Sequence, residues 1–359
     1  MTQFVATMVS LIAYLFTYFI VIKIKVLTSL FYSFFTTGTF GYYVGTIMSA
    51  LILYGVLIVY FVIQTQLLYP LTLACYAWSS GNDPDYLTSP TFESYSSAYC
   101  ALILFATLAI LCCKKDLSIY MKVGAYGVIF IFMLIIFIIV TGIVAFTNTE
   151  FMVGPAEDDA ESINWSEGLR TISMVNTNFS PLAGILGLGY FLHPASLPIV
   201  RSAAKPEHVD RDVFRGYLYV FLSYIVIGVL GYIGFVGTDF TDYFIDMAGK
   251  ASAGQIDQNC LNMFAYTDVA AFILRLSIFF LLFSGYPLVH FFLSTILLKL
   301  FFGDSEQSRF TEIAVGQSII VICLLFALFY PNIGTVLSYV GAVCGFVVIY
   351  LLPVMVYLA

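Results

Sequence analysis

The longest stretch of this chain without a charged side chain runs through residues 39–75, and it is followed by further apolar runs. Each run has about the 20 residues that an α-helix needs to cross the hydrocarbon core of a bilayer. With 61% hydrophobic and 10% charged residues, the chain has too few polar side chains to cover a folded surface in water. Because the alternating pattern of a β-barrel is missing, the backbone must satisfy its hydrogen bonds within helices. The sequence therefore predicts an all-α polytopic membrane protein.

Nine membrane-spanning helices are predicted from these runs. The second is 37 residues long, which exceeds what a bilayer needs, so it must tilt strongly or project beyond the membrane. The nine predicted spans are residues 4–22, 39–75, 96–113, 123–147, 180–200, 216–237, 269–298, 313–330 and 334–358.

Basic residues are spread unevenly over the connections between these spans. The three long loops at residues 77–98, 148–179 and 238–268 hold 14 of the 21 acids, but only Arg170 and Lys250 as basic residues. Basic residues gather on the cytoplasmic side of multi-pass proteins, so the acidic loops and the amino end are expected on the opposite side. Eleven of the 14 lysines and arginines fall on the other connections: Lys23, Lys25, Lys114, Lys115, Lys122, Arg201, Lys205, Arg211, Arg215, Lys299 and Arg309.

The acidic loop at residues 148–179 contains two glycosylation sequons, which begin at Asn164 and Asn178. Sugar is added only in the lumen of the secretory route, so these candidates agree with the predicted sidedness. A lysosomal, vacuolar or other endomembrane location is expected. The mitochondrial inner membrane fits the same asymmetry if the basic connections face the matrix.

Residues 184–200 read GILGLGYFLHPASLPIV, a sequence that is hard to fit into one straight helix. Each proline removes an amide donor and crowds the preceding turn, so a break is expected between His193 and Pro198. The pattern fits either a structural kink or a break whose freed backbone groups line a substrate site. Residues 330–334, which read YPNIG, instead predict a tight turn between the eighth and ninth spans.

Three ionisable side chains lie well inside apolar spans: His193, Arg275 and His290. An unpaired charge at the centre of a bilayer costs at least about 2.5 kcal/mol, so each is a functional candidate. Arg275 is close enough to the end of its span to reach the interface or to bind helix carbonyls, the interpretation favoured here. A histidine can stay neutral with one hydrogen bond in the core or can relay a proton. Ser284 offers a hydroxyl that bonds its own backbone or ligates an ion.

Four segments follow one another in order along the chain. They are CCKKDLSIYMKVGAYG at 112–127, GYFLHPASLPIV at 189–200, FILRLSIFFLLFSGYPLVHFFL at 272–293 and FYPNIGTVLSYVGAVCGF at 329–346. Together they resemble the amino acid/auxin permease family, above all its sodium-coupled neutral amino-acid transporter branch, which includes a lysosomal arginine-sensing member. The resemblance covers residues 100–359 well and residues 39–75 loosely.

This resemblance implies a LeuT-like fold of two inverted five-helix repeats, with substrate between a broken first and a broken sixth helix. Residues 1–147 would form an incomplete first repeat of four helices, residues 148–179 a luminal loop, and residues 180–359 a second repeat of five. On this assignment residues 4–22 match family helix two. Family helices one and eleven then have no counterpart in the chain.

The resemblance also implies site residues. Family helix six corresponds to residues 180–200 and would bind substrate, while family helix eight corresponds to residues 269–298 and would hold a sodium ion through Ser284. Arg275 matches a family arginine without a defined role. The substrate-binding candidates are Tyr190, Phe191, His193 and Ser196.

Two functions are consistent with these observations. The chain is either a secondary active amino-acid transporter coupled to sodium or protons, or a transport-inactive structural, sensing or assembly subunit whose partner membrane subunits cover the missing helix-one position. No enzyme is expected, because the spans hold no paired carboxylates, metal-ligand clusters or nucleophile constellation. Nothing in the charge pattern indicates a nucleic-acid partner.

Overall fold

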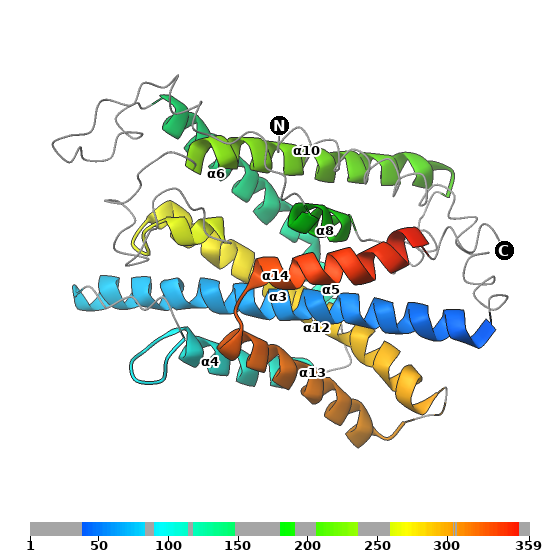
Figure 1. Cartoon of the computed structure of the whole chain (residues 1–359). Coiled ribbons are helices and arrows are strands. Elements are labelled where there is room, and N and C mark those ends of the chain that lie inside the picture. Colours follow the sequence, from blue (N-terminus) through cyan, green and yellow to red (C-terminus); the bar gives the residue numbers. More distant parts are fainter. Residues whose placement is uncertain are drawn as a thin grey trace. The chain divides into compact units, whose positions relative to one another are not determined.

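The computed structural model describes residues 38–82, 90–113, 118–147, 180–190, 206–235, 259–303, 305 and 307–351. The regular elements within these ranges are all helices (Figure 1), as the apolar runs predict. The predicted span at residues 4–22 lies outside the described residues. The helices are α3 (Gly38–Ser80), α4 (Ser97–Leu111), α5 (Ser118–Ala125), α6 (Gly127–Thr147), α8 (Ser180–Gly189), α10 (Val209–Phe235), α12 (Val269–Phe302), α13 (Arg309–Phe329) and α14 (Ile333–Tyr339). Short 3-10 helices, η2 (Pro206–His208) and η3 (Cys260–Met263), and a π-helix, η4 (Val340–Leu351), complete the described elements.

Five of the described helices are long and apolar enough to cross a membrane. The two shorter apolar helices, Ser97–Leu111 and Ile333–Val348, fall on the predicted spans at residues 96–113 and 334–358. The chain is therefore an integral membrane protein with several spanning helices. The five long segments are Tyr43–Ser80, Lys122–Ile143, Val209–Gly231, Val269–Phe302 and Arg309–Phe329.

The helix α3 confirms that the long uncharged run is a single helix. It has 43 residues, with Pro70 inside it. At 1.5 Å per residue it is about 65 Å long, roughly twice the thickness of a hydrocarbon core.

Two predicted spans differ from the observed helices in ways that their sequences explain. The run at residues 123–147 is divided by a turn at Tyr126, which separates α5 from α6 and lies between Gly124 and Gly127. The helix α10 begins at Val209, before the predicted start at residue 216. Its first turn carries Asp210 and Asp212, acids that interact favourably with the positive end of a helix dipole. The predicted turn at residues 330–334 does separate α13 from α14.

The described helices fall into two compact units, and α3 passes from one to the other at Gly55. Unit 1 contains α3 up to Gly55, α8, α10 up to Gly228, and the segment of α14 and η4 from Gly334 onward. Unit 2 contains α3 from Val56, α4, α5, α6, η3, α12 and α13.

In unit 1, α8 packs closely on the segment formed by α14 and η4. Two glycines permit this approach: a Cβ added at Gly184 would lie 2.6 Å from the carbonyl oxygen of Ser338, and one added at Gly341 would collide with the carbonyl oxygen of Gly184. Beside them Leu188 and Cys344 are buried with Ile52 of α3 in one apolar cluster, packed by Met48, Leu337, Val340 and Val348.

In unit 2, α12 packs against α5, α6 and α13, while α13 packs against α4. One apolar cluster joins Leu67 of α3, Leu261 of η3 and Leu274 of α12 to residues of α6. A second cluster joins Tyr69 and Leu73 of α3 to α4 and to the segment before α12. Unit 2 is thus held by α3 and α12, which contribute to the same buried core.

Candidate functional site

The end of α8 lies inside unit 1 and carries the first described candidate, Tyr190. The helix ends at Gly189, four residues before His193, and Tyr190 follows it as a turn. The predicted break between His193 and Pro198 lies outside the described residues. The side chain of Tyr190 is buried. The other substrate candidates, Phe191, His193 and Ser196, lie outside the described residues, as do the sequon asparagines Asn164 and Asn178.

Two tyrosines of α10 hold this helix end. The hydroxyl of Tyr224 donates to the carbonyl oxygen of Gly189 at 3.0 Å, and the hydroxyl of Tyr217 donates to the carbonyl oxygen of Tyr190 at 3.5 Å. The last carbonyls of a helix have no partner within the helix, so these bonds supply what the ended helix lacks. The rings also meet: the centroid of Tyr190 lies 6.3 Å from that of Tyr217 and 5.5 Å from that of Tyr224.

In unit 2, Ser284 is a buried hydroxyl on α12. Its Oγ donates to the carbonyl oxygen of Leu281 at 2.9 Å. A hydroxyl that donates its proton keeps lone pairs on its oxygen. Ser284 therefore satisfies its own donor locally and still presents an oxygen, the kind of atom that coordinates sodium in transporters.

Arg275 is fully buried, at 0% exposure, seven residues into α12. Its guanidinium donates to three backbone carbonyls of the segment that precedes the helix: Leu261 at 2.7 Å, Phe264 at 2.6 Å and Ala265 at 3.1 Å. These carbonyls belong to η3 and the residues after it, and those of Leu261 and Ala265 also accept from the amides of Phe264 and Asp268. Arg275 thus connects this segment to α12, and three carbonyl oxygens stabilise its positive charge.

His290 is also buried, and its Nε2 lies 2.9 Å from the carbonyl oxygen of Gly316 on α13. Because a carbonyl only accepts, this nitrogen carries the donated proton. A Cβ added at Gly316 would lie 3.0 Å from Cε1 of His290, so the glycine leaves the room that the imidazole occupies. The ring of Tyr286 is stacked beside it, with centroids 6.4 Å apart.

His290 lines a cavity of about 600 Å³ within unit 2, which lies between α12, α13 and the end of α4. The two helices each contribute one face, because the lining residues recur at the three- and four-residue spacing of a helix. From α12 these are Pro287, His290, Phe291, Ser294, Thr295, Leu298 and Lys299, and from α13 they are Arg309, Glu312, Ile313, Gly316 and Gln317.

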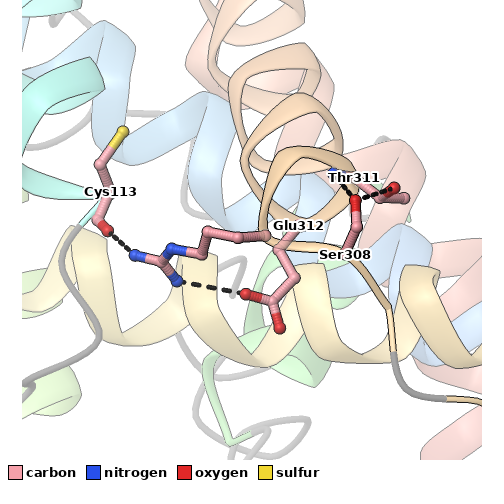
Figure 2. Close-up of polar contacts among 5 residues, drawn as sticks. Cys113, Ser308, Thr311 and Glu312 are labelled. Carbon is pink, nitrogen blue, oxygen red and sulfur yellow. Dashed lines mark hydrogen bonds and ion pairs between the residues drawn. The ribbon is translucent and has the colours of Figure 1, made fainter.

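Two side chains of α13 tie this helix to the end of α4, a contact that the sequence did not predict. Arg309 donates to the carbonyl oxygen of Cys113 at 2.6 Å and pairs with Glu312 at 3.2 Å (Figure 2). Gln317 donates to the carbonyl oxygen of Ala109 at 3.0 Å. The same first turn of α13 is capped by Ser308, whose Oγ accepts from the amide of Thr311. The sequence identifies Arg309 as a basic residue of a connection, but no sequence pattern indicates that its side chain binds Cys113, 196 residues away.

Gln64 of α3 is a further polar residue that the sequence reasoning missed. It is 0% exposed, and neither atom of its amide has a hydrogen-bond partner among the described residues. One turn before Gln64, the ring of Phe61 contacts that of Tyr286. One turn after it, Leu67 packs in the apolar cluster that also contains Leu274. An uncharged glutamine in an apolar run is the only signal that could have identified it.

Several spanning helices that enclose buried polar groups define a polytopic membrane protein. The family model described as transmembrane amino acid transporter protein matches residues 4–359, and the chain belongs to this family. Membership agrees with the resemblance that the four ordered segments predicted, and with the expectation that the chain is not an enzyme.

Among curated proteins, the chain is 30% identical over 244 residues to the sodium-coupled neutral amino acid transporter 9 homolog of Caenorhabditis elegans, covering 68% of this chain and 35% of the relative. It is 29% identical over 181 residues to neutral amino acid transporter 9 of Xenopus laevis, covering 50% and 31%. With the protein of that name from Rattus norvegicus it shares 30% identity over 184 residues, covering 51% and 31%. The matches thus span about a third of the length of these relatives.

Proposed function

We propose that this chain carries out secondary active transport of an amino acid across a membrane. The observation that carries the proposal is the match of a transmembrane amino acid transporter model to residues 4–359. The printed names of the relatives, which describe neutral amino acid transporters, support the same substrate class. The transport-inactive alternative, a structural or sensing subunit completed by partner subunits, is not favoured by this match.

For the substrate, we propose the neighbourhood of the α8 end, with Tyr190 and, further along the chain, Phe191, His193 and Ser196. A helix C-terminus carries partial negative charge, which suits the ammonium group of an amino acid. The bonds from Tyr217 and Tyr224 support this role, since they hold the helix end in one arrangement.

For the coupling ion, we propose sodium with Ser284 as one of its oxygen ligands. The name of the Caenorhabditis elegans relative describes sodium coupling, and the buried hydroxyl oxygen of Ser284 is of the type that sodium requires. His290 and Arg275 are proposed as intramembrane polar residues that support the helices around this position.

For the architecture, we propose a LeuT-like inverted repeat of about nine helices, four in residues 1–147 and five in residues 180–359, joined by a luminal loop at 148–179. The amino end would face away from the cytoplasm, in a lysosomal, vacuolar or other endomembrane. The charge asymmetry of the connections supports this orientation.

Purified protein in sealed liposomes tests the proposal. Labelled neutral amino acids are expected to accumulate when a sodium gradient is imposed, and accumulation should collapse when an ionophore dissipates it. A proton gradient and labelled cationic amino acids are run in parallel to identify the driving ion and the substrate. Correctly folded protein that shows no gradient-dependent uptake of any of these amino acids would contradict transport.

A further inference from the structure

The cavity in unit 2 lies at the ends of two spans, where phospholipid headgroups are found. The span of α12 ends at Phe302 and that of α13 begins at Arg309, so the lining residues near this end lie at the level of the membrane interface. From Lys299 back to Pro287 the lining descends 12 residues along α12. At 1.5 Å per residue this is about 18 Å, which reaches well into the hydrocarbon region.

The chemistry of the lining changes along this depth. Lys299 and Arg309, the basic residues of the described lining, lie near this interfacial end with Ser305 and Gln307. Further along α12 the lining combines the apolar Pro287 and Phe291 with the polar His290 and Ser294. A ligand that fits both regions has an anionic polar head and a largely apolar body.

The described lining carries two basic side chains and one acid. The acid, Glu312, is paired with Arg309 at 3.2 Å, with side chains 28% and 49% exposed. Lys299 is exposed and has no ion-pair partner among the described residues, while Asp304 and Glu306 of the same connection lie outside them.

We propose that this cavity binds the phosphate-bearing headgroup of an anionic phospholipid, with Lys299 as the principal cation and Arg309 as its neighbour. Basic pockets between transmembrane helices are a known mode of recognition for such headgroups. The bound lipid would lie against α12, α13 and the end of α4. Arg309 and Gln317 join α13 to the end of α4, and His290 joins α12 to α13. This site is separate from the residues proposed for substrate and sodium.

Native mass spectrometry of the whole chain in a neutral detergent tests the proposal, with phosphatidylglycerol as the probe and phosphatidylcholine as the neutral comparison. Wild-type protein is expected to retain phosphatidylglycerol preferentially. The variant Lys299→Gln should bind it about fivefold more weakly, because one basic side chain near an anionic headgroup contributes about 1 kcal/mol.

Two further variants separate a built site from general charge attraction. Lys122→Gln removes an exposed lysine that is not part of the lining, and it should leave binding unchanged. Ser294→Trp fills the cavity without changing charge, and it should abolish the preference for phosphatidylglycerol. Thermal unfolding of each variant confirms that it is folded.

The other outcomes overturn the proposal. Equal loss in Lys122→Gln and Lys299→Gln would mean diffuse attraction to the basic side. Unchanged binding in a folded Ser294→Trp would place the lipid elsewhere, and no preference in the wild type would exclude the site. If inorganic phosphate displaces the lipid and its own binding also falls in Lys299→Gln, the ligand is a soluble anion rather than a lipid.

Discussion

At the scale of single residues, the buried polar side chains of unit 2 largely bind backbone carbonyls. Ser284, Arg275 and His290 each do so, and each bond removes the cost of placing a polar group in an apolar span. The sequence identified these three residues, because polar side chains are conspicuous in apolar runs. It did not identify their partners, which depend on how the helices pack.

The role of Ser284 is tested by removing its oxygen. Ser284→Ala should raise the sodium concentration for half-maximal uptake about tenfold, since a ligand that contributes about 1.4 kcal/mol changes the equilibrium by that factor. Folding should hardly change, because the lost bond is local to its own helix. Ser277→Ala is the matched control: Ser277 is buried on the same helix and its hydroxyl donates to Ile273 at 2.7 Å. Equal sodium dependence in the two variants would remove Ser284 from the ion site.

Arg275 is expected to matter for stability. Arg275→Leu removes three hydrogen bonds from a charged donor, and a hydrogen bond of this kind contributes about 1.5–3 kcal/mol. The carbonyls of Leu261 and Ala265 keep their bonds from the amides of Phe264 and Asp268. The midpoint of thermal unfolding in detergent should fall by about 5 °C or more. A thiol-reactive dye can follow unfolding, because Cys100, Cys323 and Cys344 are buried in the folded protein. The control is Arg215→Leu, which removes an exposed arginine and should shift the midpoint little.

At the scale of elements, the lengths of helices follow from hydrophobic runs, but their ends follow from local chemistry. The run at residues 39–75 was recognised, and α3 confirms it. The end of α8 at Gly189 precedes the interval between His193 and Pro198 where a break is predicted, and that interval lies outside the described residues. The bonds from α10 that hold this end come from residues 28 and 35 positions beyond Gly189, outside any local pattern.

The close packing of α8 on the segment of α14 and η4 gives an element-scale prediction. Gly341→Ala places a methyl group against the backbone of Gly184, where nothing flexible can move aside, so the helices must separate. We expect a lower midpoint of thermal unfolding and weaker transport. Gly228→Ala is the control, because a Cβ there meets no atom within 4 Å and alanine is the better helix former. If Gly341→Ala is as stable as Gly228→Ala, the contact does not hold unit 1 together.

At the scale of the whole molecule, the transmembrane amino acid transporter model matches residues of both units, so both belong to one family domain. The match begins at residue 4 and therefore includes segments that the described ranges do not. The charge pattern predicts which side of the membrane each connection faces, and this orientation is a property of the whole chain.

Sidedness is tested with epitope tags inserted in two connections and with protease added to the cytoplasmic side of sealed vesicles. A tag between α12 and α13, near Arg309, should be cleaved, whereas a tag within the acidic loop at residues 238–268 should be protected. Detergent should expose both tags, which is the control for protease activity. Cleavage of both tags in sealed vesicles would contradict the predicted orientation.

The sequence by itself determined that this protein lives in a membrane as a set of helices and which polar residues lie inside them. The physical reason is that lipid offers the backbone no hydrogen bonds, so every apolar run must become a helix whatever its neighbours are. Only the tertiary structure decided that Arg309 reaches Cys113, that Gly341 meets Gly184, and that a cavity remains between α12 and α13. These features depend on close contacts between residues far apart in the chain, and no local pattern records such contacts.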